Sequence, residues 1–351
     1  MRHAVGLFAI LFALAATVFA DTPKQPPQAP PPLPKDALSE RTALLAPIQV
    51  ESLTLTPIVA TAAANAGAGA GAGDGLLVLD EAMARNLVKI QEIAEGNVNG
   101  LSFVNRADHP VFVMAGEVII GGKQDRIIGR NTVIPANTTQ EVPVFCVEHG
   151  RWDGKTKDFT TAKALAHGRL RGRASFAAQG DVWAEVSAKN QLRKTTSASD
   201  TYRKVAQQQS DGTLASMEKR VDAAIAKLPP ADRTRMVGYA VSLNGAVATV
   251  DVFGSPALFQ KLETKLVRSY LTEAVDVAAR KDIKPPSAGD VKAFMADADK
   301  AAEKKSYDTD AAETVVNTGA RASKAKVDYK RRPAAVNARP AAPVYETYQA
   351  Q

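Results

Sequence analysis

The stretch from Val111 to Trp152 constrains the fold more than any other part of the sequence. Short runs of β-branched and aromatic residues follow one another in this stretch, and Gly121-Gly122 separates two of them. A Gly-Gly pair between such runs predicts a β-hairpin, because the tight turns that join antiparallel strands need positive φ angles. The stretch therefore indicates an antiparallel sheet.

A two-residue turn at these glycines fixes which side chains face one another. It places Ile119 opposite Gln124 and Glu117 opposite Arg126. Because side chains alternate between the two faces of a strand, these four residues are expected to share one face. The hairpin then pairs an acid with a base.

Polar side chains gather at this hairpin and at the end of a strand expected at 140–148. An arginine fork can hold a carboxylate or phosphate through two hydrogen bonds, and a glycine turn lets backbone approach a ligand. Alternatively, Glu117 pairs with Arg126, and Glu148 with Arg151, as surface ion pairs worth about 0–1 kcal/mol each. Simple pairing is favoured because acid–base pairs are frequent on hairpins. The candidate ligand-binding residues are Glu117, Lys123, Gln124, Arg126, Glu148, Arg151 and Trp152.

Two segments of this stretch, GEVIIGGKQDR (116–126) and VPVFCVEHGRW (142–152), resemble a known domain family. The family is named for its genomic association with ADP-ribosylglycohydrolases and rhodanese-like phosphatases. LDEAMARNLVKIQE (79–92) and GYAVSLNGAVATVDVFGSPALF (238–259) fit the same family. The resemblance implies proximity to ADP-ribose metabolism, and it carries over no catalytic residue.

Later segments predict a further hairpin and packed helices. Asn244-Gly245 joins two apolar runs and is a strong signal for a two-residue turn. Ser255-Pro256 then provides the N-cap and first-turn proline of a helix that runs to about residue 279. Apolar residues recur along this helix at the spacing of a helix packed on a sheet. The fold class is therefore α+β, with mainly antiparallel strands and C-terminal helices.

The two ends of the chain differ in composition from its centre. Residues 1–20 combine Arg2, an apolar run and small residues before the expected cleavage site, as in a secretory signal. No later stretch is apolar enough to span a membrane, so the expected location is the periplasm or the exterior. The predicted organisation is a signal peptide at 1–20, a Pro-rich spacer at 21–46, one α+β domain at 47–280 with a flexible Gly/Ala-rich loop at 60–75, a weak helix within 281–308 and a disordered basic tail at 309–351.

The positive charge of the chain is concentrated at its C-terminal end. Of the formal net charge of +7, Arg2 contributes +1 and residues 319–351 contribute +5, which leaves +1 for the rest. A nearly neutral folded part argues against a nucleic-acid-binding domain. The tail is instead expected to attach weakly to anionic surfaces of the cell envelope.

Two smaller features have a structural and a functional interpretation. The single cysteine, Cys146, excludes an intramolecular disulfide and is expected to be a small buried apolar residue. Arg169, Arg171 and Arg173 alternate like one face of a strand. They form either an anion-binding edge or a solvated face, and the solvated face is favoured.

The sequence contains no zinc-ligand spacing, P-loop, dinucleotide fingerprint or nucleophile elbow, so neither a metal nor a cofactor is predicted. The favoured function is an exported binding module for a small anionic ligand, phosphate-like or ADP-ribose-like, without chemistry. The alternatives are an enzyme acting on a phosphorylated or ADP-ribose-derived molecule and a purely structural envelope protein. Bound metal or turnover of ADP-ribose derivatives would distinguish the enzyme.

The small residues Val18 and Ala20 predict that the mature chain begins at Asp21. Intact-mass measurement of the exported protein should find residues 1–20 absent, and a mass that includes them would contradict the predicted cleavage.

Overall fold

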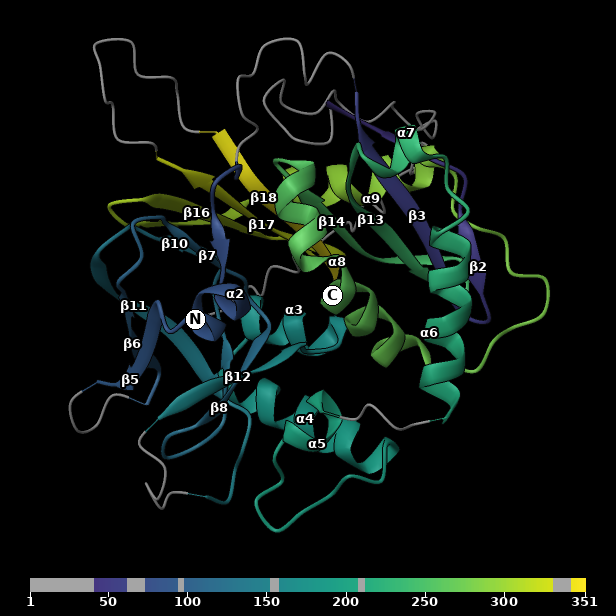
Figure 1. The fold of residues 1–351 in the computed structure, drawn as a ribbon. Helices are drawn as coiled ribbons and strands as arrows, with labels where there is room; N and C mark the ends of the chain where they lie inside the picture. Colours follow the sequence, from purple (N-terminus) through teal and green to yellow (C-terminus); the bar gives the residue numbers. More distant parts are fainter. Residues whose placement is uncertain (1–40, 62–72, 94–97, 152–157, 208–211, 331–341) are drawn as a thin grey trace, which may run out of the picture. The chain divides into compact units, whose positions relative to one another are not determined.

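The computed structural model describes residues 41–61, 73–93, 98–151, 158–207, 212–330 and 342–351. In these residues, mainly antiparallel strands form three sheets and helices pack against them, which confirms the α+β class (Figure 1). The predicted signal peptide, most of the predicted spacer and residues 62–72 of the Gly/Ala-rich loop lie outside the described residues.

The largest sheet has nine strands in the described part of the chain, in the order β1-β3-β13-β14-β18-β17-β16-β15, with β2 also paired to β3. We call it the large sheet. The Asn244-Gly245 turn joins β13 to β14, and both turn residues have positive φ, as predicted. The strands are β1 (Thr42–Leu44), β2 (Ile48–Val50), β3 (Leu53–Ala60), β13 (Met236–Leu243), β14 (Ala246–Phe253), β15 (Glu303–Asp308), β16 (Ala312–Thr318), β17 (Ala322–Tyr329) and β18 (Ala342–Ala350).

The stretch that begins at Val111 contributes to two smaller sheets, ordered β12-β8-β9-β11-β6-β5 and β10-β7-β4. Parallel pairing occurs between β4 and β7. The strands are β4 (Leu77–Val78), β5 (Val88–Glu92), β6 (Gly100–Asn105), β7 (Val111–Val113), β8 (Glu117–Gly121), β9 (Arg126–Ile128), β10 (Thr132–Ile134), β11 (Thr138–Cys146) and β12 (Phe159–Leu165).

Helix α8 begins where the sequence predicted. The Ser255 hydroxyl accepts a hydrogen bond from the Leu258 N–H at 3.2 Å, and Pro256 occupies the first turn. The buried side of α8, which includes Phe259, Leu262 and Leu266, packs into a core with residues of β3, β13 and β14. The helices are α2 (Leu79–Ala84), α3 (Gly168–Phe176), α4 (Gln179–Leu192), α5 (Arg203–Ala206), α6 (Gly212–Ile225), α7 (Pro230–Arg233), α8 (Pro256–Ala274) and α9 (Ala288–Asp299). No helix in the described residues is long and apolar enough to cross a membrane.

The Gly121-Gly122 hairpin exists, but its predicted pairing is wrong. Ile119 lies opposite Arg126, because the strands are joined by the loop Gly122–Asp125 and not by a two-residue turn. The Asp125 carboxylate accepts a hydrogen bond from the Gly121 N–H at 3.1 Å. A side chain therefore closes the loop, and the backbone turn rule does not anticipate this closure.

The prediction of a disordered tail from residue 309 is also wrong for the described residues 309–330 and 342–351. Strands β16, β17 and β18 belong to the large sheet, and β18 lies between β14 and β17. Its side chains Val344, Tyr345 and Tyr348 are fully buried. The pattern escaped detection because most of the buried residues in β16 and β17 are alanine, valine or polar residues, which make a weak apolar period. The folded domain therefore extends past the predicted boundary at 280.

The chain should depend on β18 for its stability. Deleting residues 342–351 removes a strand that pairs on both sides, together with the three buried side chains of Val344, Tyr345 and Tyr348. Each large apolar side chain is worth about 1.5–3 kcal/mol, and a typical domain has about 5–15 kcal/mol of net stability. We expect calorimetry to show a large drop in melting temperature or no cooperative transition.

The matched control is Lys304→Ala on the exposed edge strand β15. It should change the free energy of unfolding by about 0.5 kcal/mol or less. An unchanged melting temperature in the truncated chain would show that β18 does not hold the sheet together.

Candidate functional site

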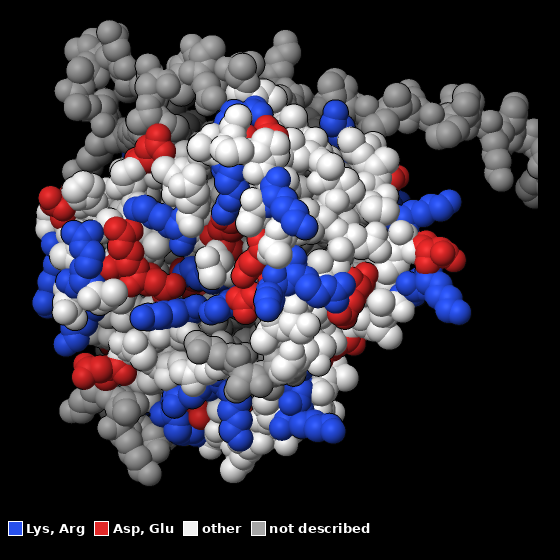
Figure 2. Space-filling model, turned by 45° about the vertical axis from the view of Figure 1, so that its right-hand side comes forward, with Lys and Arg blue, Asp and Glu red and all other residues white. Residues whose placement is uncertain are grey.

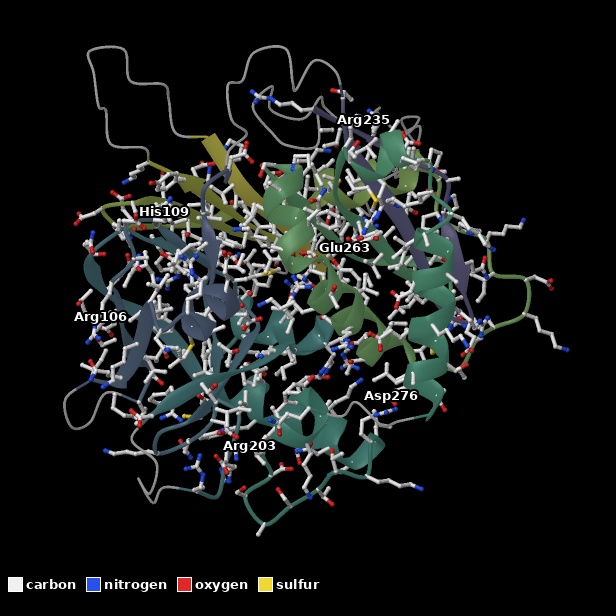
Figure 3. All side chains as sticks on the ribbon, in the orientation of Figure 1. Arg106, His109, Arg203, Arg235, Glu263 and Asp276 are labelled. Carbon is white, nitrogen blue, oxygen red and sulfur yellow. The ribbon has the colours of Figure 1, made fainter. Side chains whose placement is uncertain are left out.

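The carboxylate of Asp125, at the predicted hairpin, is fully buried and is held by several polar side chains, of which Arg151 belongs to the predicted set. Thr201 Oγ1 donates to this carboxylate at 2.8 Å, and Arg203 donates from Nε at 2.9 Å and from Nη2 at 2.6 Å. Arg203, labelled in Figure 3, approaches from α5. The hydrogen bond to Asp125 and the nearby negative charges raise the pKa of Arg203, with burial opposing them. These contacts hold the end of the loop 122–125 in place.

The predicted pair Glu148–Arg151 is present and also holds the loop 122–125. Arg151 Nε donates to Glu148 Oε2 at 2.9 Å, and Arg151 Nη1 donates to the Gly122 carbonyl at 2.8 Å. Gln124 Nε2 donates to the Glu148 carbonyl at 2.7 Å. We call Gln124, Asp125, Glu148, Arg151 and Arg203 the hairpin network. Its charged groups bond to one another, so the network explains how the loop is held.

Two other predicted residues, Lys123 and Arg126, lie next to this network. The Lys123 N–H donates to Glu92 Oε1 at 3.0 Å. Arg126 is fully buried, with Nη1 at 3.4 Å from Gln124 Oε1 and from the Asp125 carbonyl. Its Nε and Nη2 have no hydrogen-bond partner in the described part of the chain. Trp152 lies outside the described residues.

Cys146 lies opposite Arg126 on the neighbouring strand and is buried, as predicted. Burial raises the pKa of the Cys146 thiol, and the charge of Arg126 opposes that rise only in part. The thiol is therefore held in its protonated, unreactive form.

Glu117 does not pair with Arg126. Its partner is Lys265 of α8, whose Nζ also lies 2.8 Å from Asp80 Oδ2. Glu117 Oε2 accepts a hydrogen bond from the Met114 N–H at 2.8 Å. Burial lowers the pKa of Lys265, but the two carboxylates outweigh it and raise that pKa overall. The buried ion pairs join β8 and α2 to α8, and Glu117 is separate from the hairpin network.

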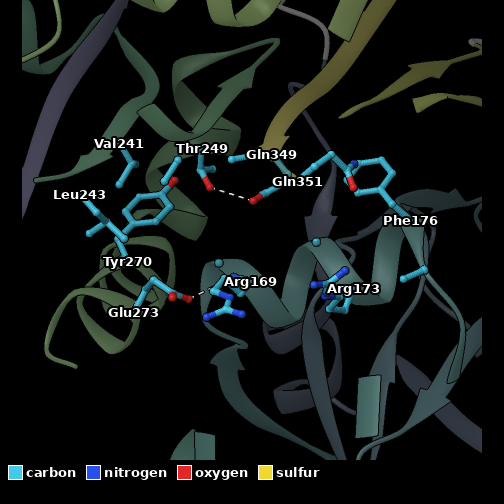
Figure 4. A pocket seen from close by; sticks show the side chains of 15 residues that line it. Arg169, Arg173, Phe176, Val241, Leu243, Thr249, Tyr270, Glu273, Gln349 and Gln351 are labelled. Atoms are coloured by element: carbon cyan, nitrogen blue, oxygen red, sulfur yellow. Dashed lines mark hydrogen bonds between the residues drawn. The ribbon is translucent and has the colours of Figure 1, made fainter. Parts of the chain in front are cut away.

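A different part of the molecule contains a cavity of about 330 Å³, between α3, α8 and the strands β13, β14 and β18 (Figure 4). Its wall combines aromatic and aliphatic side chains with arginine, glutamate and amide groups. The lining residues are Gly168, Arg169, Gly172, Arg173, Phe176, Ala177, Val241, Leu243, Ala248, Thr249, Tyr270, Glu273, Gln349, Ala350 and Gln351.

Helix α3 brings two arginines to this cavity. The strand-like alternation predicted for residues 169–173 is wrong, because Gly168–Phe176 is helical. Residues four apart share one face of a helix, so Arg169 and Arg173 both line the cavity. Arg171 lies on another side of α3 and is buried. The three arginines therefore do not form one anion-binding edge.

Arg171 anchors α3 to the large sheet. Its Nη1 and Nη2 donate to the two carboxylate oxygens of Asp251 at 3.1 and 2.9 Å. Tyr270 and Tyr345 also donate to Asp251 through their hydroxyls. Burial alone would raise the pKa of Asp251, but the Arg171 charge and these hydrogen bonds lower it. Tyr270 lines the cavity, so this cluster fixes one part of its wall.

Glu273 of α8 enters the cavity beside the start of α3. Its Oε2 accepts a hydrogen bond from the Arg169 N–H at 3.1 Å and lies 4.0 Å from His167 Nε2. His167 is fully buried, with Nε2 at 3.0 Å from Glu185 Oε1 and Nδ1 at 2.8 Å from the Tyr202 hydroxyl. Burial lowers the pKa of His167, and the nearby carboxylates offset only part of that effect. The imidazole is therefore neutral near pH 7.

Sequence reasoning missed most of the cavity. Arg169 and Arg173 have the four-residue spacing of one helix face, but their alternation with Arg171 favours a strand. Glu273, Thr249 and Gln349 come from segments far apart in the sequence, and no local pattern connects them. No group of three or more His, Cys, Asp or Glu side chains in the described residues could hold a metal ion.

The buried pair Lys265–Glu117 should be strongly coupled. Lys265→Met leaves Glu117 and Asp80 without their cation in a buried setting, so it should cost about 3–5 kcal/mol. Adding Glu117→Gln should recover part of that loss, as measured by denaturant unfolding.

The control for this cycle is the exposed pair Arg220–Glu51. Arg220→Met should cost about 1 kcal/mol or less. Equal losses in Lys265→Met and Arg220→Met would show that the buried charges are not essential to the fold.

Comparison with curated proteins and with solved structures found no match. A family model, described as the ARG and Rhodanese-Phosphatase-superfamily-associated Protein domain, matches residues 41–338. The match includes both hairpins, α3, α8 and strands β15 to β17, and it confirms the resemblance found in the sequence. The chain belongs to the ARG and Rhodanese-Phosphatase-superfamily-associated Protein domain family.

Proposed function

We propose that this protein is an exported module that binds a small anionic ligand in the cavity beside α3, without chemical conversion. The proposal rests on Arg173, whose guanidinium has no partner among the described residues. Its side chain makes no hydrogen bond or ion pair with any residue that the structure describes, yet it lines the cavity. A cation without a protein partner at a cavity wall is suited to a carboxylate or phosphate, which an arginine can bind through two hydrogen bonds.

The other arginines of the two candidate regions are less available. Arg171 is bound to Asp251, and Arg151 and Arg203 belong to the hairpin network. Arg126 has two nitrogens without a partner in the described residues, but it is fully buried and lies outside the cavity. The guanidinium of Arg169 lies 3.4 Å from Glu185 Oε2. The proposal therefore places the ligand at the cavity, and it assigns the hairpin network to support of the loop.

The rest of the cavity suits the uncharged part of such a ligand. Val241, Leu243 and Phe176 provide apolar surface, and Tyr270 provides an aromatic side chain held by its bond to Asp251. A volume of about 330 Å³ lies at the lower end of ligand pockets, roughly 300–1,000 Å³. This size favours a small anion with an apolar or aromatic portion.

We prefer binding without chemistry because the cavity wall lacks an activated nucleophile in the described residues. The described lining residues include no serine, cysteine or histidine. The Thr249 hydroxyl donates to Gln349 Oε1 at 2.8 Å. The Tyr270 hydroxyl is bonded to the Asp251 carboxylate, but burial raises the pKa of Tyr270, so this hydroxyl is a poor nucleophile.

The cellular setting of the proposal rests on the sequence. The signal-like residues 1–20 support export to the periplasm or the exterior. Acidic and basic side chains are interspersed over much of the face drawn in Figure 2. This distribution favours a local site for a small ligand over a broad basic surface for a polyanion. The basic residues near the C-terminal end lie partly in β17, so a free tail is not part of the proposal.

The test is a calorimetric titration with inorganic phosphate, phenyl phosphate and ADP-ribose. Phenyl phosphate should bind more tightly than inorganic phosphate, because its ring can cover the apolar wall. Arg173→Gln should weaken phenyl phosphate binding about tenfold or more, the effect of losing a charge-assisted hydrogen bond of about 1.5–3 kcal/mol.

The matched control is Lys219→Gln, which removes one exposed positive charge on α6, outside the cavity. It should leave the affinity unchanged. If none of the three anions binds at millimolar concentration, or if both variants lose the same affinity, the proposed site is wrong.

A further inference from the structure

The cavity presents a carboxylate as well as a guanidinium. Glu273 Oε2 is occupied by the Arg169 N–H, whereas Oε1 has no hydrogen-bond partner in the described residues. Both Glu273 and Arg173 line the same cavity. A ligand that carried only negative charge would bind Arg173, but it would also lie in the same cavity as the negatively charged Glu273.

The cationic side chains near Glu273 do not form close ion pairs with it. Arg169 has its guanidinium directed to Glu185, at 3.4 Å. Lys189 Nζ lies 2.7 Å from Asp276 Oδ2 and donates to the Thr272 carbonyl at 2.6 Å. His167 is neutral near pH 7, because burial lowers its pKa. The cations near Glu273 thus have carboxylates of their own.

The helix sets the spacing between the two open charges. Glu273 is bonded to the backbone of Arg169 at the start of α3, and Arg173 lies one turn further along (Figure 4). Four residues of α-helix rise about 6 Å. Apolar side chains, among them Val241, Leu243 and Tyr270, contribute to the same wall.

We infer that the ligand is a small zwitterion, with a carboxylate or phosphate at Arg173 and a protonated amine at Glu273, joined by a short apolar spacer. This inference rests on the proposed function, because it uses the same cavity and the same arginine. It adds a second recognition element, which selects amine-bearing anions over plain anions. A charge that is desolvated on binding favours a partner of opposite charge and penalises a ligand that lacks one.

The test compares two pairs of probes that differ only in the amine: 5-aminopentanoate with pentanoate, and 4-aminobutyl phosphate with butyl phosphate. Calorimetric titration should show each amine-bearing probe binding about tenfold more tightly than its partner. Comparison of the two pairs shows whether the anionic group is a carboxylate or a phosphate.

Glu273→Gln should abolish this preference, since the amide keeps an oxygen to accept the Arg169 N–H but loses the negative charge. Binding of pentanoate or butyl phosphate should remain or improve. Arg173→Gln should weaken both members of each pair. Asp310→Asn removes an exposed carboxylate outside the cavity and should preserve the preference.

The outcomes separate this inference from the proposed function. If the plain anions bind and the amine adds nothing, the zwitterion inference is overturned and the anion site stands. The same holds if the amine adds affinity equally in Glu273→Gln. If neither member of either pair binds, the anion site itself is refuted.

Discussion

The ion pair between Arg171 and Asp251 determines where the functional groups of this protein lie. It fixes α3 against β14, and the hydroxyls of Tyr270 and Tyr345 extend it to α8 and β18. A Cβ at Gly116 would lie only 2.5 Å from Arg171 Cγ, so the glycine leaves space for this side chain. With α3 held in this way, Arg169 and Arg173 reach the cavity.

A second set of buried charges connects the smaller sheets to α8. Lys265 bridges Glu117 of β8 and Asp80 of α2, and Ser269 Oγ donates to the Ala166 carbonyl at 2.5 Å. Helix α8 therefore presents three kinds of contact: apolar residues to the core, charged residues to the smaller sheets and Glu273 to the cavity. The cavity lies where these elements meet, so its geometry depends on tertiary contacts more than on any one segment.

The sequence predicted the features that depend on local chemistry. The α+β class, the Asn244-Gly245 turn, the N-cap of α8 and the buried Cys146 each follow from neighbouring residues. The pairing of Glu117 failed because its cation, Lys265, lies 148 residues away in the chain. The hairpin register failed because the Asp125 side chain closes a longer loop. Strand β18 was missed because its burial comes from its place between β14 and β17.

The candidate site shows the same limit. The hairpin residues Gln124, Glu148 and Arg151 do converge, but they satisfy one another, and the cavity takes its groups from α3, α8, β13, β14 and β18.

The central claim is that Arg173, rather than an arginine of the hairpin network, receives the anion. The most direct measurement is an NMR titration that follows the arginine Nε–Hε signals as phenyl phosphate is added. The account predicts a saturable shift for Arg173 with Arg151 and Arg203 unchanged, whereas shifts at Arg151 and Arg203 with Arg173 unchanged would contradict it.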